Sequence, residues 1–345
     1  MHAFSYFLII YYFSSQPRLH LKLWEKVMNH LKILGISCLA FFMTVFTAYS
    51  ETRVTYKSAK TTSSYYQMAV QISEALKQGS NGQIILTVEE SQGSVQNVKE
   101  VAVRSGNYVF TTPPVLIKLA QKSLAMFKGK ENPKYDNIRA LFPIPSLTMH
   151  FVARKDSGIK SFSDLQGKKL LIGKGSFGAK EGAKYLKLFG LENKVRLANV
   201  ELNAAVSALK NKQIDGFVTA GSWPAPNVIE ASASTEIDLL SLNDQQLKLT
   251  KRTKLIIPAN TYKGVTSPTV TTSLPVIAHT TTDMNTDTAY TITKTYWGQK
   301  KSMGTKNAWW DGVSPDLLVN VYGKIHPGAL KYYDEIGVKI PPEMR

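Results

Sequence analysis

The feature that most constrains this sequence is an order of short apolar segments and helix-like segments that occurs twice. The first occurrence has apolar segments at 54–56, 83–89, 107–111 and 138–142, and segments with apolar residues at helical spacing at 65–77, 95–105 and 114–127. Strands that alternate with helices form a mostly parallel sheet with helices on its faces. The first half of the chain therefore predicts an α/β unit.

The same order returns after a predicted strand at 148–154, which could cross out of the first unit. It places strands at 169–172, 195–200, 216–219, 255–258 and 267–278, helices at 179–189, 204–210, 288–301 and 315–322, and a short capped turn at 162–168. Residues 275–277 are expected to return to the first unit. We predict an α/β fold of two lobes, with lobe I at 51–150 plus 276–345, lobe II at 151–275, and a ligand cleft between them.

Residues 1–50 read as an upstream extension followed by a secretory signal peptide. Lys32 precedes an apolar run of 17 residues, Ile33 to Tyr49, and Ala48-Tyr49-Ser50 offers a cleavage site before Glu51. We expect the mature chain to start near Glu51 and Met28 to be the true start. Because the run is at the short end of what spans a bilayer, an uncleaved anchor helix is the alternative.

Cysteine content and charge indicate which compartment and which classes of partner to expect. The single cysteine, Cys38, lies in the signal segment, and an exported chain without disulfides is typical of a bacterial periplasm. The chain carries 42 Lys and Arg against 25 Asp and Glu, a net charge of +17. These lysines are scattered, and no basic helix interleaves with aromatic residues. A solvated basic exterior is favoured over a field that attracts anions, and nucleic-acid binding is not expected.

A glycine loop at 173–178 matches the pattern G-x-G-x-x-G. It follows a predicted strand and opens a predicted helix, and Glu201 lies 23 residues beyond Gly178, as in dinucleotide-binding proteins. The physical basis is more general, because glycines admit a close ligand and a helix N-terminus attracts any anion. A general anion site is favoured, a structural turn and a dinucleotide site stay open, and export argues against NAD.

Two further loops between a strand and a helix, at 58–66 and 91–97, offer hydroxyl groups and backbone amides. Lys60 is the only cation in these two loops, so a small carboxylate is the expected guest. Ser and Asn are also favoured helix caps, which is the structural alternative for each loop taken alone. Trp223 and the pair Trp309-Trp310 are candidates for lobe packing or for a ligand lid, and core packing is favoured for the pair.

Signatures of an enzyme or a metal site are missing. His150, His279 and His326 are the only histidines after residue 50, none has a second ligand at metal spacing, and His326 before Pro327 is expected to start a helix. Ser176 lacks the G-x-S-x-G frame of a nucleophile, and no Walker lysine follows the glycine loop. We predict no enzymatic activity, no cofactor and no metal.

Several segments, taken in order, resemble the TAXI family of TRAP (tripartite ATP-independent periplasmic) transporter receptors. They are SSYY at 63–66, QGSVQN at 92–97, DSGI at 156–159, DLQGK at 164–168, the glycine loop, GSWPAP at 221–226, and HPGA with YY at 326–333. The resemblance covers about residues 54–341. Two loops depart from the family pattern: 60–63 is not glycine-rich, and 175–178 reads GSFG where Gly-Ser-Gly-Thr is usual.

The resemblance implies the two-lobed type II periplasmic binding fold and a receptor for a glutamate- or 2-oxoglutarate-like carboxylate, delivered to a TRAP permease. Family contacts carry onto Ser64, Tyr65, Ser94, Asn97, Ser176 and Gly178, and the loops add Lys60, Phe177 and Trp223 to the expected ligand site. A monomer is expected. A periplasmic enzyme or nucleotide-binding protein that uses the glycine loop, and a ligand-sensing domain, are the alternatives.

Overall fold

Ten strands of the described chain form one continuous mixed sheet in the computed structural model, which describes residues 28, 51–104, 106–174 and 176–345. The strands are β1 (Thr52–Lys57), β2 (Ile84–Glu89), β3 (Tyr108–Thr112), β4 (Ile138–Arg154), β5 (Lys169–Leu171), β6 (Arg196–Ala198), β7 (Gly216–Gly221), β8 (Ile237–Leu239), β9 (Thr253–Ile257) and β10 (Thr269–Thr281). Their order is β2-β1-β3-β10-β4-β7-β5-β6, with β8 paired to β4 and β9 to β10. The predicted signal segment and Cys38 lie outside the described residues.

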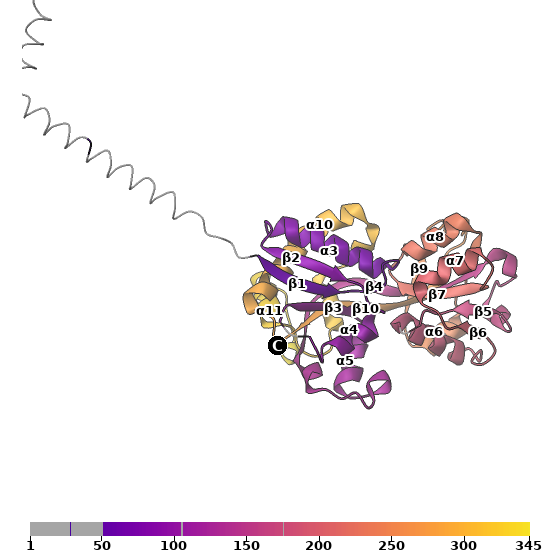
Figure 1. Ribbon diagram of the computed structural model, residues 1–345, viewed down its shortest axis with the longest axis horizontal. Helices are drawn as coiled ribbons and strands as arrows, with labels where there is room; N and C mark the ends of the chain where they lie inside the picture. The colour runs from indigo at the N-terminus through magenta and orange to yellow at the C-terminus, as the bar shows by residue number, and fades with distance from the viewer. Residues whose placement is uncertain (1–27, 29–50, 105, 175) are drawn as a thin grey trace, which may run out of the picture. The chain divides into compact units, whose positions relative to one another are not determined.

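Two long strands, β4 and β10, pair antiparallel and extend across both parts of this sheet (Figure 1). The second half of β10 lies between β3 and the first half of β4, whereas the other halves of β4 and β10 pair with β7, β8 and β9. We call the part built on β1–β3 lobe I and the part built on β5–β7 lobe II. Two lobes joined by two crossings were predicted, and this architecture is confirmed; the boundaries at 150/151 and 275/276 stay predictions.

The prediction of separate strands at 138–142 and 148–154 is wrong, because β4 is continuous. Pro143 and Pro145 lie between the two predicted strands, and proline cannot donate to a strand ladder. The pairing with β10 shifts register between Leu274 and Val276, beside these prolines. A local irregularity therefore accommodates both prolines without ending the strand.

Helices of lobe I cover both faces of its part of the sheet. They are α3 (Ser64–Gly79), α4 (Ser94–Glu100), α5 (Pro114–Gln121), α10 (Thr286–Lys306) and α11 (Pro327–Glu335). Figure 1 shows α3 and α10 on one side of β1, and α4 and α5 on the other. Three predicted helices are shorter than expected: α4 ends at Glu100, α5 ends before Ser123 and Ala125, which have positive φ, and 315–320 forms a 3₁₀ turn.

Lobe II carries α6 (Phe177–Leu188), α7 (Ala205–Lys210), α8 (Pro226–Ser234) and α9 (Asp244–Thr250). The segment α8-β8-α9 was not predicted from sequence. A second, smaller hydrophobic core lies in this lobe between β7, α7 and α8, and includes Leu209, Phe217 and Val228. The capped turn predicted at 162–168 is confirmed, with Ser161 and Asp164 forming a capping box.

Candidate functional site

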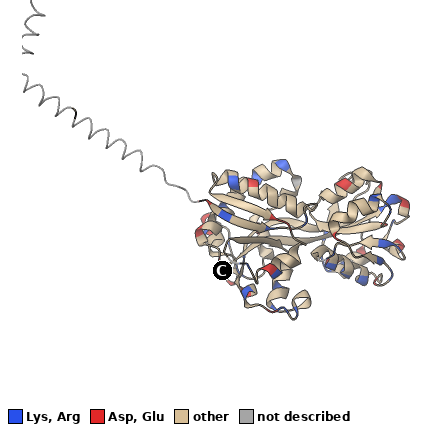
Figure 2. Ribbon diagram, in the orientation of Figure 1, with Lys and Arg blue, Asp and Glu red and all other residues tan. Residues whose placement is uncertain are grey.

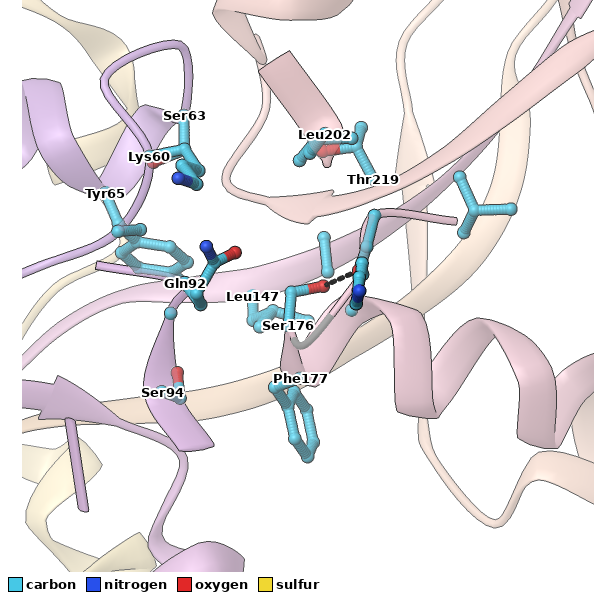
Figure 3. A pocket seen from close by; sticks show the side chains of 17 residues that line it. Lys60, Ser63, Tyr65, Gln92, Ser94, Leu147, Ser176, Phe177, Leu202 and Thr219 are labelled. Carbon is cyan, nitrogen blue, oxygen red and sulfur yellow. Dashed lines mark hydrogen bonds between the residues drawn. The ribbon is translucent and has the colours of Figure 1, made fainter. Parts of the chain in front are cut away.

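A cavity of about 50 Å³ lies where the two lobes face each other (Figure 3). Lobe I contributes Ala59, Lys60, Ser63, Tyr65, Gln92, Gly93 and Ser94; strand β4 contributes Leu147; lobe II contributes Gly173, Lys174, Ser176, Phe177, Gly178, Leu202, Val218, Thr219 and Ala220. The three loops chosen from the sequence therefore meet at one cavity. Six of the nine predicted contacts line it, and their contact with a ligand stays a prediction.

The start of α3 is fixed to the rest of the site by its own side chains. Ser63 caps the helix, and its hydroxyl accepts a hydrogen bond of 3.2 Å from the amide of Tyr66. The hydroxyl of Tyr65 donates to the carbonyl of Pro145 on β4 at 3.2 Å, and burial raises the pKa of Tyr65 well above its usual value. The Tyr65 ring therefore lines the cavity as a neutral, anchored side chain.

Ser64 lies outside the cavity lining and forms a contact near the crossing strands instead. Its hydroxyl accepts a hydrogen bond of 2.8 Å from the backbone amide of Ser222, which follows β7. The Ser222 hydroxyl in turn donates to the carbonyl of Ser146 on β4 at 2.8 Å. A side chain at Gly221 would collide with the Ser64 hydroxyl, so glycine is needed for this close approach.

The start of α4 brings Ser94 to the cavity but not Asn97. Asn97 is fully buried, and its Nδ2 donates to the carbonyls of Lys57, Ser58 and Thr111 at 3.3, 2.7 and 3.1 Å. These carbonyls belong to the ends of β1 and β3 and the loop after β1. The structure thus places Asn97 as a brace that holds the loop at 58–66 in position.

The start of α6 closes the glycine loop on itself. The Ser176 hydroxyl accepts from the amide of Ala179 at 2.9 Å and donates to the carbonyl of Gly173 at 3.0 Å (dashed in Figure 3). A Cβ at Gly178 would lie 2.8 Å from that of Ala220, so this glycine permits α6 to pack on β7. The amides of Tyr66 and Ala179 are thus taken by the two caps. The amides of the first two residues of α3 and α6 have no acceptor within their own helix and are the natural donors to an anion.

Lys60 lines the cavity and is already paired. Its Nζ lies 2.6 Å from Oε2 of Glu201 and 3.5 Å from Oε1 of Glu90. Gln92 donates from Nε2 to Oε1 of Glu201 at 2.5 Å. The hydrogen bond that Lys60 donates to Glu201 raises the pKa of Lys60, and the hydrogen bonds that Glu201 accepts from Lys60 and then Gln92 lower the pKa of Glu201. Both groups are therefore charged at neutral pH.

Trp223 lies on the other side of β4 from this cavity. It lines a separate cavity of about 330 Å³ together with Ser146, Thr148 and Trp309. Successive side chains of a strand point to opposite faces, so Leu147 faces the small cavity and its two neighbours face the large one. A lid role for Trp223 over the small cavity has no support in this geometry. Trp310 is core, as favoured, and donates from Nε1 to Gln71 at 2.7 Å.

Sequence reasoning missed several lining residues. Gln92 and Lys174 stood inside the chosen loops without being singled out, and Glu201 was noted only for a dinucleotide. Thr219 and Ala220 lie at the end of β7, where ligands of α/β proteins often bind. That rule could have pointed to them from the predicted strand at 216–219.

The histidines serve the fold. Burial lowers the pKa of His150 to about 4 and that of His279 to about 3. His326 caps α11, as predicted, and its Nδ1 accepts from the amide of Gly328 at 3.1 Å. Within the described ranges no group of three or more His, Cys, Asp or Glu could hold a metal ion, and no helix is long and apolar enough to cross a bilayer.

Comparison with known proteins identifies the family and the fold of this chain. Residues 57–337 match the NMT1-like family. The chain belongs to this family. Among solved structures it is similar to the periplasmic binding protein BugD, with a TM-score of 0.54, 12% identity, and coverage of 83% of this chain and 98% of that one. At this identity the similarity shows the fold, and the predicted periplasmic-binding-protein fold is confirmed.

Two further structures similar to this member of the NMT1-like family are more distant. A TRAP periplasmic solute binding protein from Actinobacillus succinogenes with bound L-galactonate has a TM-score of 0.44, 13% identity, and coverage of 83% and 92%. The alkanesulfonate-binding protein SsuA from Xanthomonas axonopodis pv. citri has a TM-score of 0.44, 11% identity, and coverage of 86% and 96%. The fold assignment rests on BugD alone.

Proposed function

We propose that this member of the NMT1-like family is an exported solute receptor of the TAXI type, which binds a small organic anion and delivers it to a TRAP membrane permease. The observation that carries the proposal is the cavity between the lobes. Lys60 and Lys174 are among its described lining residues, and no acidic residue is. The first-turn amides of α3 and α6 add partial positive charge. The BugD-like fold supports a receptor.

The volume of the cavity limits the size of the ligand. A water molecule needs about 10–15 Å³ of such space, so a volume of about 50 Å³ holds on the order of four waters. A compact carboxylic acid fits this space better than a nucleotide does. Glutamate- and 2-oxoglutarate-like acids, which the TAXI resemblance implies, are at the large end of this range.

The contacts of the glycine loop favour an anion receptor over an enzyme and over a nucleotide-binding protein. Its serine hydroxyl is engaged with the loop's own backbone, and Gly178 is explained by packing against Ala220. A nucleophile or a dinucleotide site would need the hydroxyl or the space above the loop to be free. The basic surface adds no separate partner, because Lys and Arg are spread over both lobes with Asp and Glu among them (Figure 2).

Calorimetric titration of the exported protein tests the proposal. The panel contains acetate, pyruvate, succinate, 2-oxoglutarate and glutamate, with NAD and sulfate as controls. We expect saturable binding of one or more carboxylates, and unchanged ligand when it is recovered and analysed by mass spectrometry. Binding of NAD, or chemical conversion of a bound acid, would contradict the receptor function. Loss of uptake of the labelled acid in cells lacking this chain distinguishes transport from sensing.

A further inference from the structure

Glu201 joins the two lobes at the edge of the cavity. It follows β6 in lobe II, whereas its partners Lys60 and Gln92 follow β1 and β2 in lobe I. Among the ion pairs formed between described residues, the pair Lys60–Glu201 is the one that spans the lobes. In Figure 3 the side chains of Lys60 and Gln92 lie on the same side of the cavity.

We propose that Glu201 is a latch that holds the two lobes closed through Lys60 and Gln92 and thereby sets how fast a ligand leaves. The effect on the ligand rests on the proposed receptor function, whereas the effect on the lobes does not. A latch contact exists only in the closed arrangement, so its free energy shifts the balance between open and closed states.

The surroundings of Glu201 favour this role over that of an ordinary surface ion pair. The Lys60 side chain is only 16% exposed, and each oxygen of the 40% exposed Glu201 has its own partner, at 2.6 and 2.5 Å. Partly shielded charges are screened less by salt than exposed ones. Two partners on separate loops of lobe I also fix the carboxylate in one position.

Two polar contacts between the lobes have been described. The ion pair Lys60–Glu201 is the charged one. The other cross-lobe contact described above, Ser64 to Ser222, is neutral and lies near the crossing strands. Glu201 is thus the charged contact that attracts the lobes.

The two roles that Glu201 could have for an anionic ligand predict opposite effects of Glu201→Gln on ligand binding. If its charge mainly repels the ligand, Glu201→Gln should strengthen binding. If it is a latch, the same change should open the cleft and speed ligand release. Glu90 provides the matched control, because it also pairs with Lys60, at 3.5 Å, but belongs to lobe I. Glu90→Gln removes the same charge without touching a contact between lobes.

Distances between spin labels test the latch without any ligand. The labels are placed on cysteines at exposed Lys128 of lobe I and exposed Lys187 of lobe II, in a full-length Cys38→Ser background. We expect Glu201→Gln and Lys60→Met each to lower the ratio of closed to open molecules about two- to fivefold, and Glu90→Gln to leave it unchanged. The double variant should lower it no further than one single change. Equal distance distributions in Glu201→Gln and the parent overturn the latch.

Ligand release is the second readout, with 2-oxoglutarate as the probe in stopped-flow dilution. Glu201→Gln should release it about two- to fivefold faster, while Glu90→Gln should match the parent. Slower release in both variants overturns the latch in favour of simple charge repulsion. If no carboxylate binds the parent, the receptor function fails, and the spin-label distances still decide whether Glu201 holds the lobes together.

Discussion

The hydroxyl of Tyr262 donates a hydrogen bond of 2.9 Å to Nε2 of His150, where β4 runs into lobe II. The direction follows from the other ring nitrogen: Nδ1 lies 3.2 Å from the carbonyl of Thr148, which can only accept, so Nε2 carries no proton. Tyr262 also accepts from the amide of Ala225 at 2.8 Å. One buried tyrosine therefore ties the segment before β10 to β4 and to the start of α8.

Tyr262→Phe should destabilise the protein by about 2–3 kcal/mol. The change keeps the ring and its packing, but it leaves the amide of Ala225 and Nε2 of His150 buried without a partner, which is the costly case. Urea unfolding followed by circular dichroism measures the loss. Tyr66→Phe, at a partly exposed tyrosine, is the control and should change stability by about 0.5 kcal/mol or less. Equal effects of both changes would contradict the bridging role of Tyr262.

Stability should fall as the pH drops from about 6.5 towards 4. Burial lowers the pKa of His150 to about 4 and that of His279 to about 3, so both stay neutral in the folded state while their unfolded forms take up protons. Unfolding then binds protons, and each histidine contributes up to about 1.4 kcal/mol per pH unit to the loss. Above about pH 8 the unfolded histidines are neutral as well, so neither contributes a slope.

The slope of stability against pH separates the contribution of His279 from that of His150 when one variant is compared with the parent. His279 stacks on Phe110 and is fully buried, so His279→Phe keeps an aromatic ring there and removes the titrating group. The variant should show a slope between pH 6 and 4.5 that is smaller by about one proton, whatever its absolute stability. Urea midpoints at several pH values measure it. An unchanged slope would show that His279 does not take up a proton on unfolding.

The sequence predicted the parts of the fold that depend on local patterns. Strand and helix spacing identified β1 to β3, and cap residues such as Ser161 identified the turn before β5. The continuity of β4 could not be predicted locally, because Pro143 and Pro145 normally break a strand. Only the long pairing with β10 across both lobes accommodates them, and that pairing joins residues more than 100 positions apart.

The candidate site could be predicted as a set of loops but not as a set of contacts. Ser64 and Asn97 sit in loops that reach the cavity, yet their polar groups bond to Ser222 and to backbone carbonyls. Sequence cannot show which hydroxyl or amide a fold uses for itself. The pairing of Lys60 with Glu201 depends on two lobes meeting, which no local pattern encodes.

Ser176→Asp should weaken carboxylate binding at least about tenfold and leave the protein folded. Aspartate is itself a favoured cap, so it can replace the hydroxyl that accepts from Ala179. Its negative charge would then stand at the start of α6 inside the cavity and repel the ligand. Calorimetric titration measures the change. Asn243→Asp, which adds the same charge at the cap of α9, is the control and should bind like the parent.

Ser176→Ala should cost stability more clearly than affinity. The hydroxyl makes both of its hydrogen bonds within the glycine loop and the first turn of α6, and loss of such a cap costs about 1 kcal/mol. The backbone amides at the start of α6 remain. Paired urea and calorimetric measurements should show lower stability with affinity within about fivefold of the parent. A larger loss of affinity at unchanged stability would mean that the hydroxyl itself binds the ligand.

Gly178→Ala should destabilise the protein by about 1–3 kcal/mol and weaken ligand binding. The added Cβ would lie 2.8 Å from Cβ of Ala220 and 3.3 Å from its amide nitrogen, so α6 must move away from β7. Ser176 and Phe177 would move with the helix start and enlarge the cavity. Gly298→Ala is the matched control, because that glycine lies in α10 with no atom within 4 Å of its Cβ position. It should stabilise the protein by about 0.5–1 kcal/mol, because alanine favours helix. Unchanged stability of Gly178→Ala would contradict the role of this glycine in packing α6 on β7.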